Sequence, residues 1–319
     1  MIRRSLLALA AGTTLGCAPL RSIGPPSPGR WERRAGLNTP RDDFGAAVAG
    51  GSIYVLGGMS GERGNDLDTV EVYDPAANAW SRGPRLPTPV SSLRAAVLGS
   101  SVFAVGGSVR SGEVAHVWRL PLGARDSAWE PAPPLRTARL GHGLAALGQR
   151  LIAAGGLVRG EPTTDAELFD AERNIWSPIA PLPEPRFNLA LVTLGADGGS
   201  ANRTARPVVY ALGGSGPDRK PSTSVFVYDP PTDRWTTGPS LPQPLSNFGA
   251  AVLDNRLHAL LHKHHFTLTP GDSTWQLRPP MPTSRHGQAI AALNGALYAV
   301  GGCSEDPQRD LPTLEVYRP

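Results

Sequence analysis

Ser52-Ile53-Tyr54-Val55-Leu56-Gly57-Gly58 is a short β-rich run that ends in a pair of glycines, and the chain repeats it. A second β-rich run, Val70-Glu71-Val72-Tyr73, stops at the turn sequence Asp74-Pro75, and Trp80 follows. The same order recurs at three further places: Gly106-Gly107 with Trp129, Gly155-Gly156 with Trp176, and Gly213-Gly214 with Trp235. A last pair, Gly301-Gly302, precedes Leu314-Glu315-Val316-Tyr317. Self-similarity at a steady period predicts an array of like structural units.

The tryptophans give the period of this array. Trp31, Trp80, Trp129, Trp176, Trp235 and Trp275 lie 49, 49, 47, 59 and 40 residues apart. The pattern resembles the kelch repeat, whose period is about 50 residues for each four-stranded blade. The resemblance covers Trp31 to Tyr317, and it implies an all-β, six-bladed kelch propeller over residues 31–319.

The second and fifth blades depart from the kelch pattern, and the fourth blade carries an insertion. Phe248-Gly249-Ala250-Ala251-Val252 nearly repeats the start of the first blade, so Leu261-His262 should replace the glycine pair in a degenerate fifth blade. In the second blade, Trp118-Arg119-Leu120-Pro121 stands in the place of Tyr-Asp-Pro. The long fourth spacing is explained by a polar insertion at residues 196–206.

The two ends of the array should complete each other. Trp31 has no inner strands before it, and Tyr317 has no tryptophan after it. The economical arrangement makes the Trp31 strand the outer strand of the last blade. Such a closure leaves no open sheet edge between the first and last blades.

The first 30 residues look like a leader and a tether. Residues 1–17 combine a basic start, a short apolar stretch and Thr14-Leu15-Gly16-Cys17, which resembles a bacterial lipoprotein cleavage box. We expect lipidation at Cys17 and an exported protein of the cell envelope, periplasmic or held at the outer membrane. The alternative is an ordinary secretory signal with an incidental cysteine. Residues 18–30 are proline-rich and predict a semi-extended tether.

Charge and composition narrow the function classes. The formal net charge is +4, and subtracting Arg3 and Arg4 of the leader leaves +2. The cations are spread along the chain, so we expect no nucleic acid partner, and no membrane contact beyond the lipid. No nucleophile elbow, phosphate loop or metalloprotease motif occurs.

A ring of arginines is the first candidate site. Equivalent inter-blade positions hold Arg41, Val90, Arg139, Arg186, Leu245 and Arg285. The arginines could attract a carboxylate-bearing ligand. Alternatively they pair with Glu71, Glu167 and Glu315 and brace adjacent sheets, an interpretation favoured because repeated residues usually serve the repeat.

A second set of positions lies two residues further on. It holds Asp43, Ser92, Gly141, Asn188, Asn247 and Gly287, which differ between blades as an asymmetric binding surface or an unconstrained loop would. His142 and His286 stand beside these positions and are interpreted as ligand contacts or solvated loop residues. From both sets, the ligand-binding candidates are Arg41, Asp43, Arg139, Arg186, Asn188, Asn247, Arg285 and His286.

A histidine-rich stretch offers a weaker metal hypothesis. His262 and His264 point the same way in an extended strand, and Cys303 takes a neighbouring position in the next blade. A Cys-His-His site is therefore conceivable, although no carboxylate completes it in the sequence. Our interpretation assigns no metal and no cofactor.

The kelch resemblance implies a function class more than a ligand. Kelch propellers are mostly non-catalytic binding modules, so it implies a protein or glycan partner, anionic if the arginines contact it. N-acetylneuraminate epimerases are an enzyme alternative, with an acid/base residue and arginines in a top-face pocket. Galactose-oxidase-like enzymes are another, and they need copper and a tyrosine cross-linked to cysteine. A perturbed carboxylate or histidine in a deep axial pocket would favour an enzyme.

Overall fold

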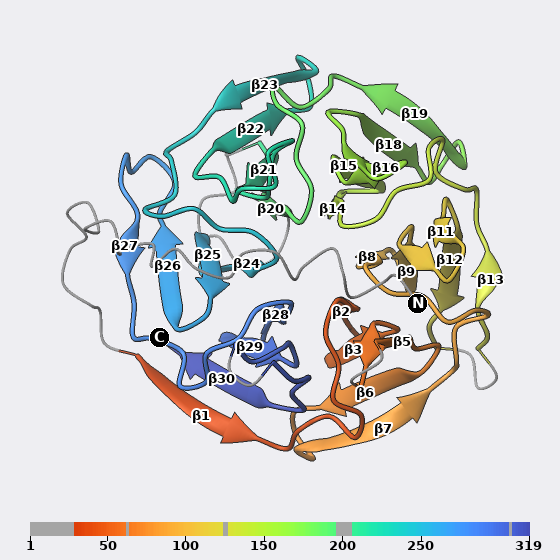
Figure 1. The fold of residues 1–319 in the computed structure, drawn as a ribbon, viewed down its shortest axis with the longest axis vertical. Helices are drawn as coiled ribbons and strands as arrows, with labels where there is room; N and C mark the ends of the chain where they lie inside the picture. The colour runs from red at the N-terminus through yellow and green to blue at the C-terminus, as the bar shows by residue number, and fades with distance from the viewer. Residues whose placement is uncertain (1–28, 62–63, 124–126, 196–205, 306–307) are drawn as a thin grey trace.

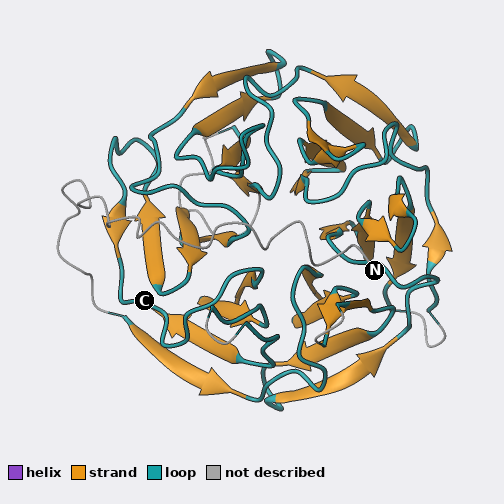
Figure 2. Ribbon diagram, viewed as in Figure 1, coloured by secondary structure: helices purple, strands orange, loops and turns teal. Residues whose placement is uncertain are grey.

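The computed structural model describes residues 29–61, 64–123, 127–195, 206–305 and 308–319. In these residues the chain forms strands and loops only (Figure 2), and no helix there is long and apolar enough to cross a membrane. Six four-stranded sheets surround one axis (Figure 1). The predicted six-bladed, all-β propeller is confirmed.

Each blade is an antiparallel sheet, and in blades 1 to 5 the strands follow one another outward from the axis in chain order. Blade 1 contains β2 (Gly45–Ala49), β3 (Ser52–Leu56), β6 (Val70–Asp74) and β7 (Ala79–Gly83). Blade 2 contains β8 (Arg94–Leu98), β9 (Ser101–Val105), β12 (Val117–Pro121) and β13 (Glu130–Pro131). Blade 3 contains β14 (Gly143–Leu147), β15 (Arg150–Ala154), β18 (Ala166–Asp170) and β19 (Ile175–Ile179).

The other three blades follow the same plan. Blade 4 contains β20 (Ala190–Leu194), β21 (Val208–Leu212), β22 (Val225–Asp229) and β23 (Arg234–Thr237). Blade 5 contains β24 (Gly249–Leu253), β25 (Arg256–Leu261), β26 (His264–Leu268) and β27 (Gln276–Leu277). Blade 6 contains β28 (Ala289–Leu293), β29 (Ala296–Val300), β30 (Leu314–Arg318) and β1 (Arg30–Arg34).

Three short hairpins project from the loops between second and third strands. They are β4 (Met59–Ser60) with β5 (Asn65–Asp66), β10 (Ser108–Val109) with β11 (Gly112–Glu113), and β16 (Leu157–Val158) with β17 (Glu161–Pro162).

The predicted closure is confirmed. Strand β1 pairs with β30, with Trp31 opposite Tyr317, and Figure 1 shows the first described strand beside the last. Each outer tryptophan indole donates to a backbone carbonyl just after the preceding blade: Trp80 to Ala35 (2.7 Å), Trp129 to Pro84 (2.9 Å), Trp176 to Pro133 (2.9 Å), Trp235 to Ala180 (2.8 Å), Trp275 to Pro239 (3.0 Å) and Trp31 to Pro279 (3.0 Å). Trp31 therefore does in the last blade what the other five tryptophans do in theirs.

The irregular regions also lie where the sequence places them. His262 N–H donates to the Arg285 carbonyl (2.8 Å), as the second glycine of each pair does to the next blade, so Leu261-His262 replaces a glycine pair. The insertion at residues 196–206 falls between β20 and β21, and 196–205 lie outside the described residues. Strand β1 begins at Arg30, one residue before the predicted propeller start. The leader 1–17 and tether residues 18–28 lie outside the described residues.

The glycine pair is required by the close approach of neighbouring blades. Gly57 has φ 60°, and a β-carbon there would lie 2.4 Å from the Val90 carbonyl oxygen, in the segment that leads into the next blade. Gly155 has φ 66°, and its β-carbon would lie 2.5 Å from the Arg186 carbonyl oxygen of the next blade. The buried core is distributed between neighbouring sheets, and one cluster joins Leu56 and Val70 of blade 1 to Val102 and Trp129 of blade 2.

Candidate ligand-binding site

Six residues, one from each inter-blade segment, form a closed ring of backbone hydrogen bonds around the axis. We call them the axial ring, and φ lies between 49° and 64° in every member: Asp43, Ser92, Gly141, Asn188, Asn247 and Gly287. Each N–H donates to the carbonyl of the preceding member: Asp43 to Gly287 (3.3 Å), Ser92 to Asp43 (2.7 Å), Gly141 to Ser92 (3.1 Å), Asn188 to Gly141 (2.6 Å), Asn247 to Asn188 (3.0 Å) and Gly287 to Asn247 (2.8 Å).

The axial ring explains residue types that the sequence left open. Left-handed backbone is tolerated best by glycine, asparagine and aspartate, and five of the six members are of these types. The residues at these positions therefore vary mainly among types that tolerate left-handed backbone, and the conformation of these loops is constrained. The recurrence of Asp, Asn and Gly at these equivalent positions is the feature of the sequence that indicates the left-handed backbone.

Two polar side chains of the axial ring, Asp43 and Asn247, meet at one end of the axis. Asn247 Nδ2 donates to Asp43 Oδ1 (3.1 Å), past Gly287, which has no side chain between them. The Asn188 side chain lies over Gly141, where a β-carbon would come within 2.5 Å of Asn188 Oδ1. The predicted candidates Asp43, Asn188 and Asn247 therefore lie on one ring, and Asp43 and Asn247 are in contact.

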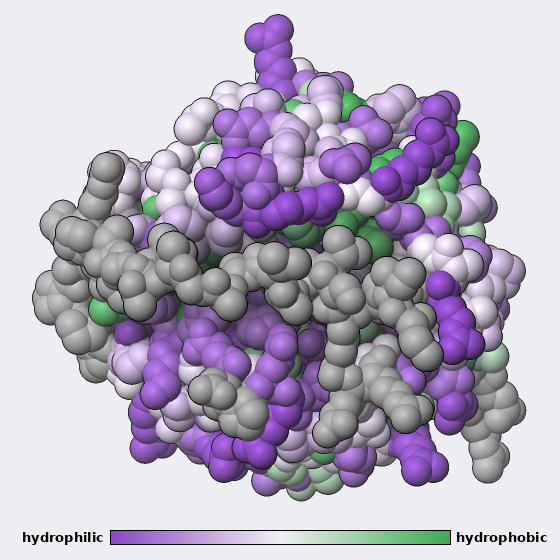
Figure 3. All heavy atoms as spheres, viewed as in Figure 1, coloured by the Kyte–Doolittle hydropathy of each residue, from purple (hydrophilic) through white to green (hydrophobic). Residues whose placement is uncertain are grey.

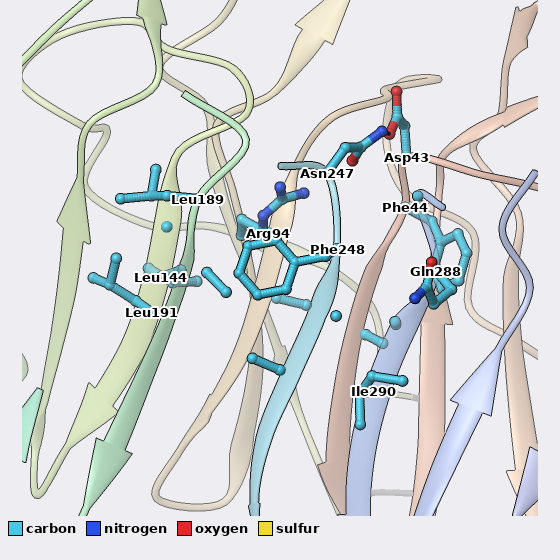
Figure 4. Close-up of a pocket in the computed structure, with 18 residues that line it drawn as sticks. Asp43, Phe44, Arg94, Leu144, Leu189, Leu191, Asn247, Phe248, Gln288 and Ile290 are labelled. Atoms are coloured by element: carbon cyan, nitrogen blue, oxygen red, sulfur yellow. Dashed lines mark hydrogen bonds between the residues drawn. The ribbon is translucent and has the colours of Figure 1, made fainter. Parts of the chain in front are cut away.

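Below these side chains lies a cavity of about 230 Å³, formed between the innermost strands of the blades. We call it the axial cavity. Its apolar walls include Leu144, Leu191, Phe248 and Ile290, and its polar lining includes Asp43, Asn247, Arg94 and Gln288 (Figure 4). Arg94 and Gln288 were not predicted. Aligning the innermost strands would have found them, because the position of Arg94 holds glycine or alanine in the other blades, and the position of Gln288 holds phenylalanine, leucine or His142.

Three arginines of the predicted arginine ring form buried ion pairs within their own blades. The pairs are Arg41 with Glu71 (2.7 Å), Arg139 with Glu167 (2.9 Å) and Arg285 with Glu315 (3.0 Å). All three arginines are at most 1% exposed, which leaves no surface for a ligand. Burial lowers the pKa of Arg285 to about 10, and Glu315 opposes the shift.

The geometry supports the bracing interpretation, with one refinement. The Arg41 side chain holds Glu71 of its own blade, while its carbonyl accepts from Gly302 of blade 6 (2.9 Å). The side chain therefore anchors the inter-blade segment, and the backbone joins the neighbouring sheets.

Comparison with known proteins agrees with this geometry. The kelch motif family matches residues 40–87, 138–183, 204–242 and 284–319, together more than half of the chain. The chain belongs to the kelch-repeat family. The matches fall on blades 1, 3, 4 and 6, and they leave out the two blades whose sequences depart from the kelch pattern.

The curated relatives are kelch proteins of greater length. The chain is 25% identical to kelch-like protein 35 of Mus musculus over 44% of its own length and 23% of the relative. It is 32% identical to kelch-like protein 40 of Mus musculus over 30% of its length and 16% of the relative. It is 24% identical to alpha-scruin of Limulus polyphemus over 50% of its length and 18% of the relative. The matched stretches thus span less than a quarter of each relative.

Arg186 departs from the other kelch arginines. Phe226 occupies the third-strand position that holds glutamate in blades 1, 3 and 6. The Arg186 guanidinium pairs instead with Glu184, which is half-exposed, and with the Ser222 (3.0 Å) and Ser224 (3.2 Å) hydroxyls. Among the ring arginines, Arg186 is the one with contacts close to the surface.

The described residues do not assemble the predicted Cys-His-His trio of this kelch chain. His262 Nδ1 lies 2.6 Å from Glu305 Oε1, and His264 Nδ1 contacts Gln243 Nε2 (3.0 Å). Within the described ranges, the trio whose ligand atoms lie within 4.8 Å of one another is Asp42, Cys303 and Asp310. Burial, helped by these aspartates, raises the pKa of Cys303 to about 12, so its thiol is protonated at neutral pH. A metal role for His262, His264 and Cys303 stays untested.

The two histidines beside the axial ring have different environments. His142 is fully buried, so its interpretation as a solvated loop residue is wrong. Neither ring nitrogen has a described partner, and burial, with Arg94 and Arg139 nearby, lowers the pKa of His142 well below 6.5. His286 pairs through its backbone with Cys303, and its ring lies 6.2 Å from that of His262. His286 does not line the axial cavity.

Proposed function

We propose that this kelch propeller is a non-catalytic binding module for a protein, and that its binding face is formed by the inter-blade segments and the loops between second and third strands. The support is the unequal length of those loops. Between second and third strands lie 13, 11, 11, 12 and 13 residues in blades 1, 2, 3, 4 and 6, but only His262 and Lys263 in blade 5. One face of the propeller is thereby asymmetric and offers a partner one orientation.

The chemistry of the surface suits a polar contact. Among the described residues, Ile175 is the one large hydrophobic side chain that is exposed. Figure 3 shows a face whose described surface is mainly hydrophilic, with hydrophobic residues at scattered places. A partner held by such a surface relies on hydrogen bonds and charge, so raising the salt concentration should weaken the association.

The axial cavity gives the epimerase-like alternative little support. Of the residues that line it, Asp43 is the one carboxylate, and none is a histidine. His142, whose pKa is strongly lowered, lies outside the lining. The galactose-oxidase-like alternative needs a tyrosine cross-linked to Cys303, whereas the described side chains around the Cys303 thiol include Asp42 and Asp310, whose ligand atoms lie within 4.8 Å of it. A glycan in place of a protein remains an outcome for the binding test.

Site-specific photo-crosslinking in the cells that make the protein tests the proposal. A photo-reactive residue at Lys263, in the short blade 5 turn, should give a discrete protein adduct. The same residue at Arg173, in the exposed turn between the third and fourth strands of blade 3, is the matched control on the opposite face. Equal adducts from both positions, or none from Lys263, would contradict the proposed face.

We also propose that the propeller is exported and held at a membrane by a lipid on Cys17. The support is the leader sequence of residues 1–17 and the proline-rich tether that follows. Metabolic labelling with radioactive palmitate tests it: the full chain should incorporate label and fractionate with membranes. The Cys17→Ser variant should do neither. Labelling that survives this substitution would refute the assignment.

A further inference from the structure

Arg94 is the exception among six equivalent positions at the axis. It is the first residue of the innermost strand of blade 2. The matching positions in the other blades hold only small residues: Gly45, Gly143, Ala190, Gly249 and Ala289. Small residues are needed there because the strands converge, and a β-carbon at Gly45 would lie 3.1 Å from the side chain of Ala95. An arginine at this place is not explained by the repeat.

The guanidinium of Arg94 lines the axial cavity and has no ion-pair partner among the described residues. No carboxylate oxygen of a described residue lies within 4.0 Å of its nitrogens. Its hydrogen bond goes to the carbonyl of Leu93 (3.2 Å). Burial lowers the pKa of Arg94, and Asp43 at the cavity end opposes the shift. Arg41, Arg139 and Arg285 all have carboxylate partners.

Gln288 provides a second polar group that the fold does not satisfy. It is 5% exposed and takes the place that Phe44, Leu93, His142, Leu189 and Phe248 have in the other blades. Its Nε2 donates to the Leu260 carbonyl (2.9 Å), but its Oε1 is buried with no described hydrogen-bond partner. Leaving such an acceptor unpaired is unfavourable, so a ligand that donates a hydrogen bond to it would gain affinity.

These polar groups belong to the lining of a single cavity. Arg94, Gln288 and Asp43 all line the axial cavity, together with the apolar side chains of Leu144, Leu191 and other wall residues (Figure 4). The Arg94 guanidinium carries a positive charge and several N–H donors, whereas Gln288 Oε1 and the Asp43 carboxylate are hydrogen-bond acceptors. A ligand with both an acid group and a donor would satisfy these groups at once. An anion without a donor would satisfy Arg94 but leave Gln288 unpaired.

We propose that the axial cavity binds a small organic carboxylate that also carries a hydroxyl or ammonium group, with the acid held by Arg94 and the donor by Gln288 Oε1. The remaining carbon skeleton contacts the apolar walls. The cavity lies on the axis, and Asp43 and Asn247 of the inter-blade segments contribute to its lining. The small-molecule proposal rests on Arg94 and Gln288, whereas the protein-binding proposal rests on the unequal loops, so either can fail without the other.

Isothermal titration calorimetry on the full chain tests the site with four probes at up to 50 mM. Glycerate and L-valine carry an acid and a donor, propionate carries an acid only, and glycerol carries donors only. At least one of the first two should bind, and should bind more tightly than propionate and glycerol. Failure of both glycerate and L-valine, or equal binding of propionate, would overturn the proposal.

Two variants assign the binding to the named groups. Arg94→Ala installs the residue found at Ala190 and Ala289, so the fold should tolerate it, and it should weaken binding about tenfold or more. Arg173→Ala, on an exposed turn, is the matched control and should leave binding unchanged. Gln288→Leu should bring the affinity of the donor-bearing probe down to that of propionate. Binding that persists in folded Arg94→Ala protein, confirmed by an unchanged thermal midpoint, would refute the assignment.

Discussion

Replacing Arg41 by leucine should destabilise the propeller much more than the same replacement of Arg186. Both residues occupy the same place in their blades, but their surroundings differ. Arg41 donates to Glu71 Oε1 (2.7 Å), to the Gly57 carbonyl (2.9 Å) and to Thr69, and both members of the ion pair are buried. Arg186 faces half-exposed Glu184, and Phe226 stands where Glu71 stands in blade 1.

The magnitudes follow from what each substitution leaves behind. Arg41→Leu leaves the Glu71 carboxylate buried without its cation, and breaking a buried pair in this way costs about 3–5 kcal/mol. The lower end applies, because Glu71 keeps hydrogen bonds from the backbone N–H groups of Asn38 (2.8 Å) and Thr39 (3.0 Å). Arg186→Leu frees Glu184 to water and should cost about 1 kcal/mol or less. It also copies blade 5, where Leu245 and Phe266 occupy these two positions.

Urea unfolding followed by tryptophan fluorescence measures both variants against the parent chain. The midpoint for Arg41→Leu should fall clearly, and that for Arg186→Leu should stay near the parent value, with equal slopes in all three. Adding Glu71→Phe to Arg41→Leu should recover part of the loss. Recovery should be incomplete, because the N–H groups of Asn38 and Thr39 then lose their acceptor. Equal losses in the two single variants would refute the bracing role.

Three further predictions concern buried or half-buried side chains. Burial lowers the pKa of His258 to about 3 and that of its hydrogen-bonded neighbour His265 to about 2, so protonation favours the unfolded chain. The free energy of unfolding is therefore highest above about pH 6.5, where these histidines are neutral in the folded and the unfolded chain. It should fall by several kcal/mol as the pH is lowered towards 3, as measured by urea titration at each pH. The double variant His258→Tyr/His265→Val, which copies the side chains of other blades, should flatten this dependence. His142→Leu removes two ring nitrogens that have no partner among the described residues. It should increase the free energy of unfolding by about 1–3 kcal/mol and raise the thermal midpoint in calorimetry. A lower midpoint would show that the imidazole has a hydrogen-bond partner. Trp31→Ala should cost about 3 kcal/mol by urea unfolding, and no loss would contradict closure through β1.

The architecture could be predicted because every blade repeats the same local requirement. Glycine pairs mark where a β-carbon would meet the backbone of the next blade, and tryptophans mark where an indole reaches a carbonyl of the preceding one. These requirements act at fixed spacing, so blade number, the degenerate blade 5 and the position of Trp31 follow from counting. The ion pairs of Arg41, Arg139 and Arg285 were anticipated for the same reason.

The candidate site could be predicted only in part, because it depends on residues that break the pattern. Asp43, Asn188 and Asn247 were located, but their shared left-handed backbone was not inferred from their types. Arg94 begins β8 and Gln288 immediately precedes β28, so an alignment of the innermost strands locates both residues. Whether the Arg94 guanidinium or the Gln288 amide finds a partner depends on distances across the axis, which sequence spacing does not contain.

Three sets of hydrogen bonds run around the propeller, and they help to separate residues that serve the fold from residues that can serve recognition. The axial ring, the bonds from the glycine pairs and the bonds of the outer tryptophans each join all six blades, and the residues that form them are fixed by geometry. A residue type that repeats with these sets is explained by stability, as the buried arginines show. Specific recognition requires groups that occur once. In the described chain such groups include Arg94, Gln288 and the short blade 5 turn at Lys263, and substitutions there should alter binding while leaving the fold intact.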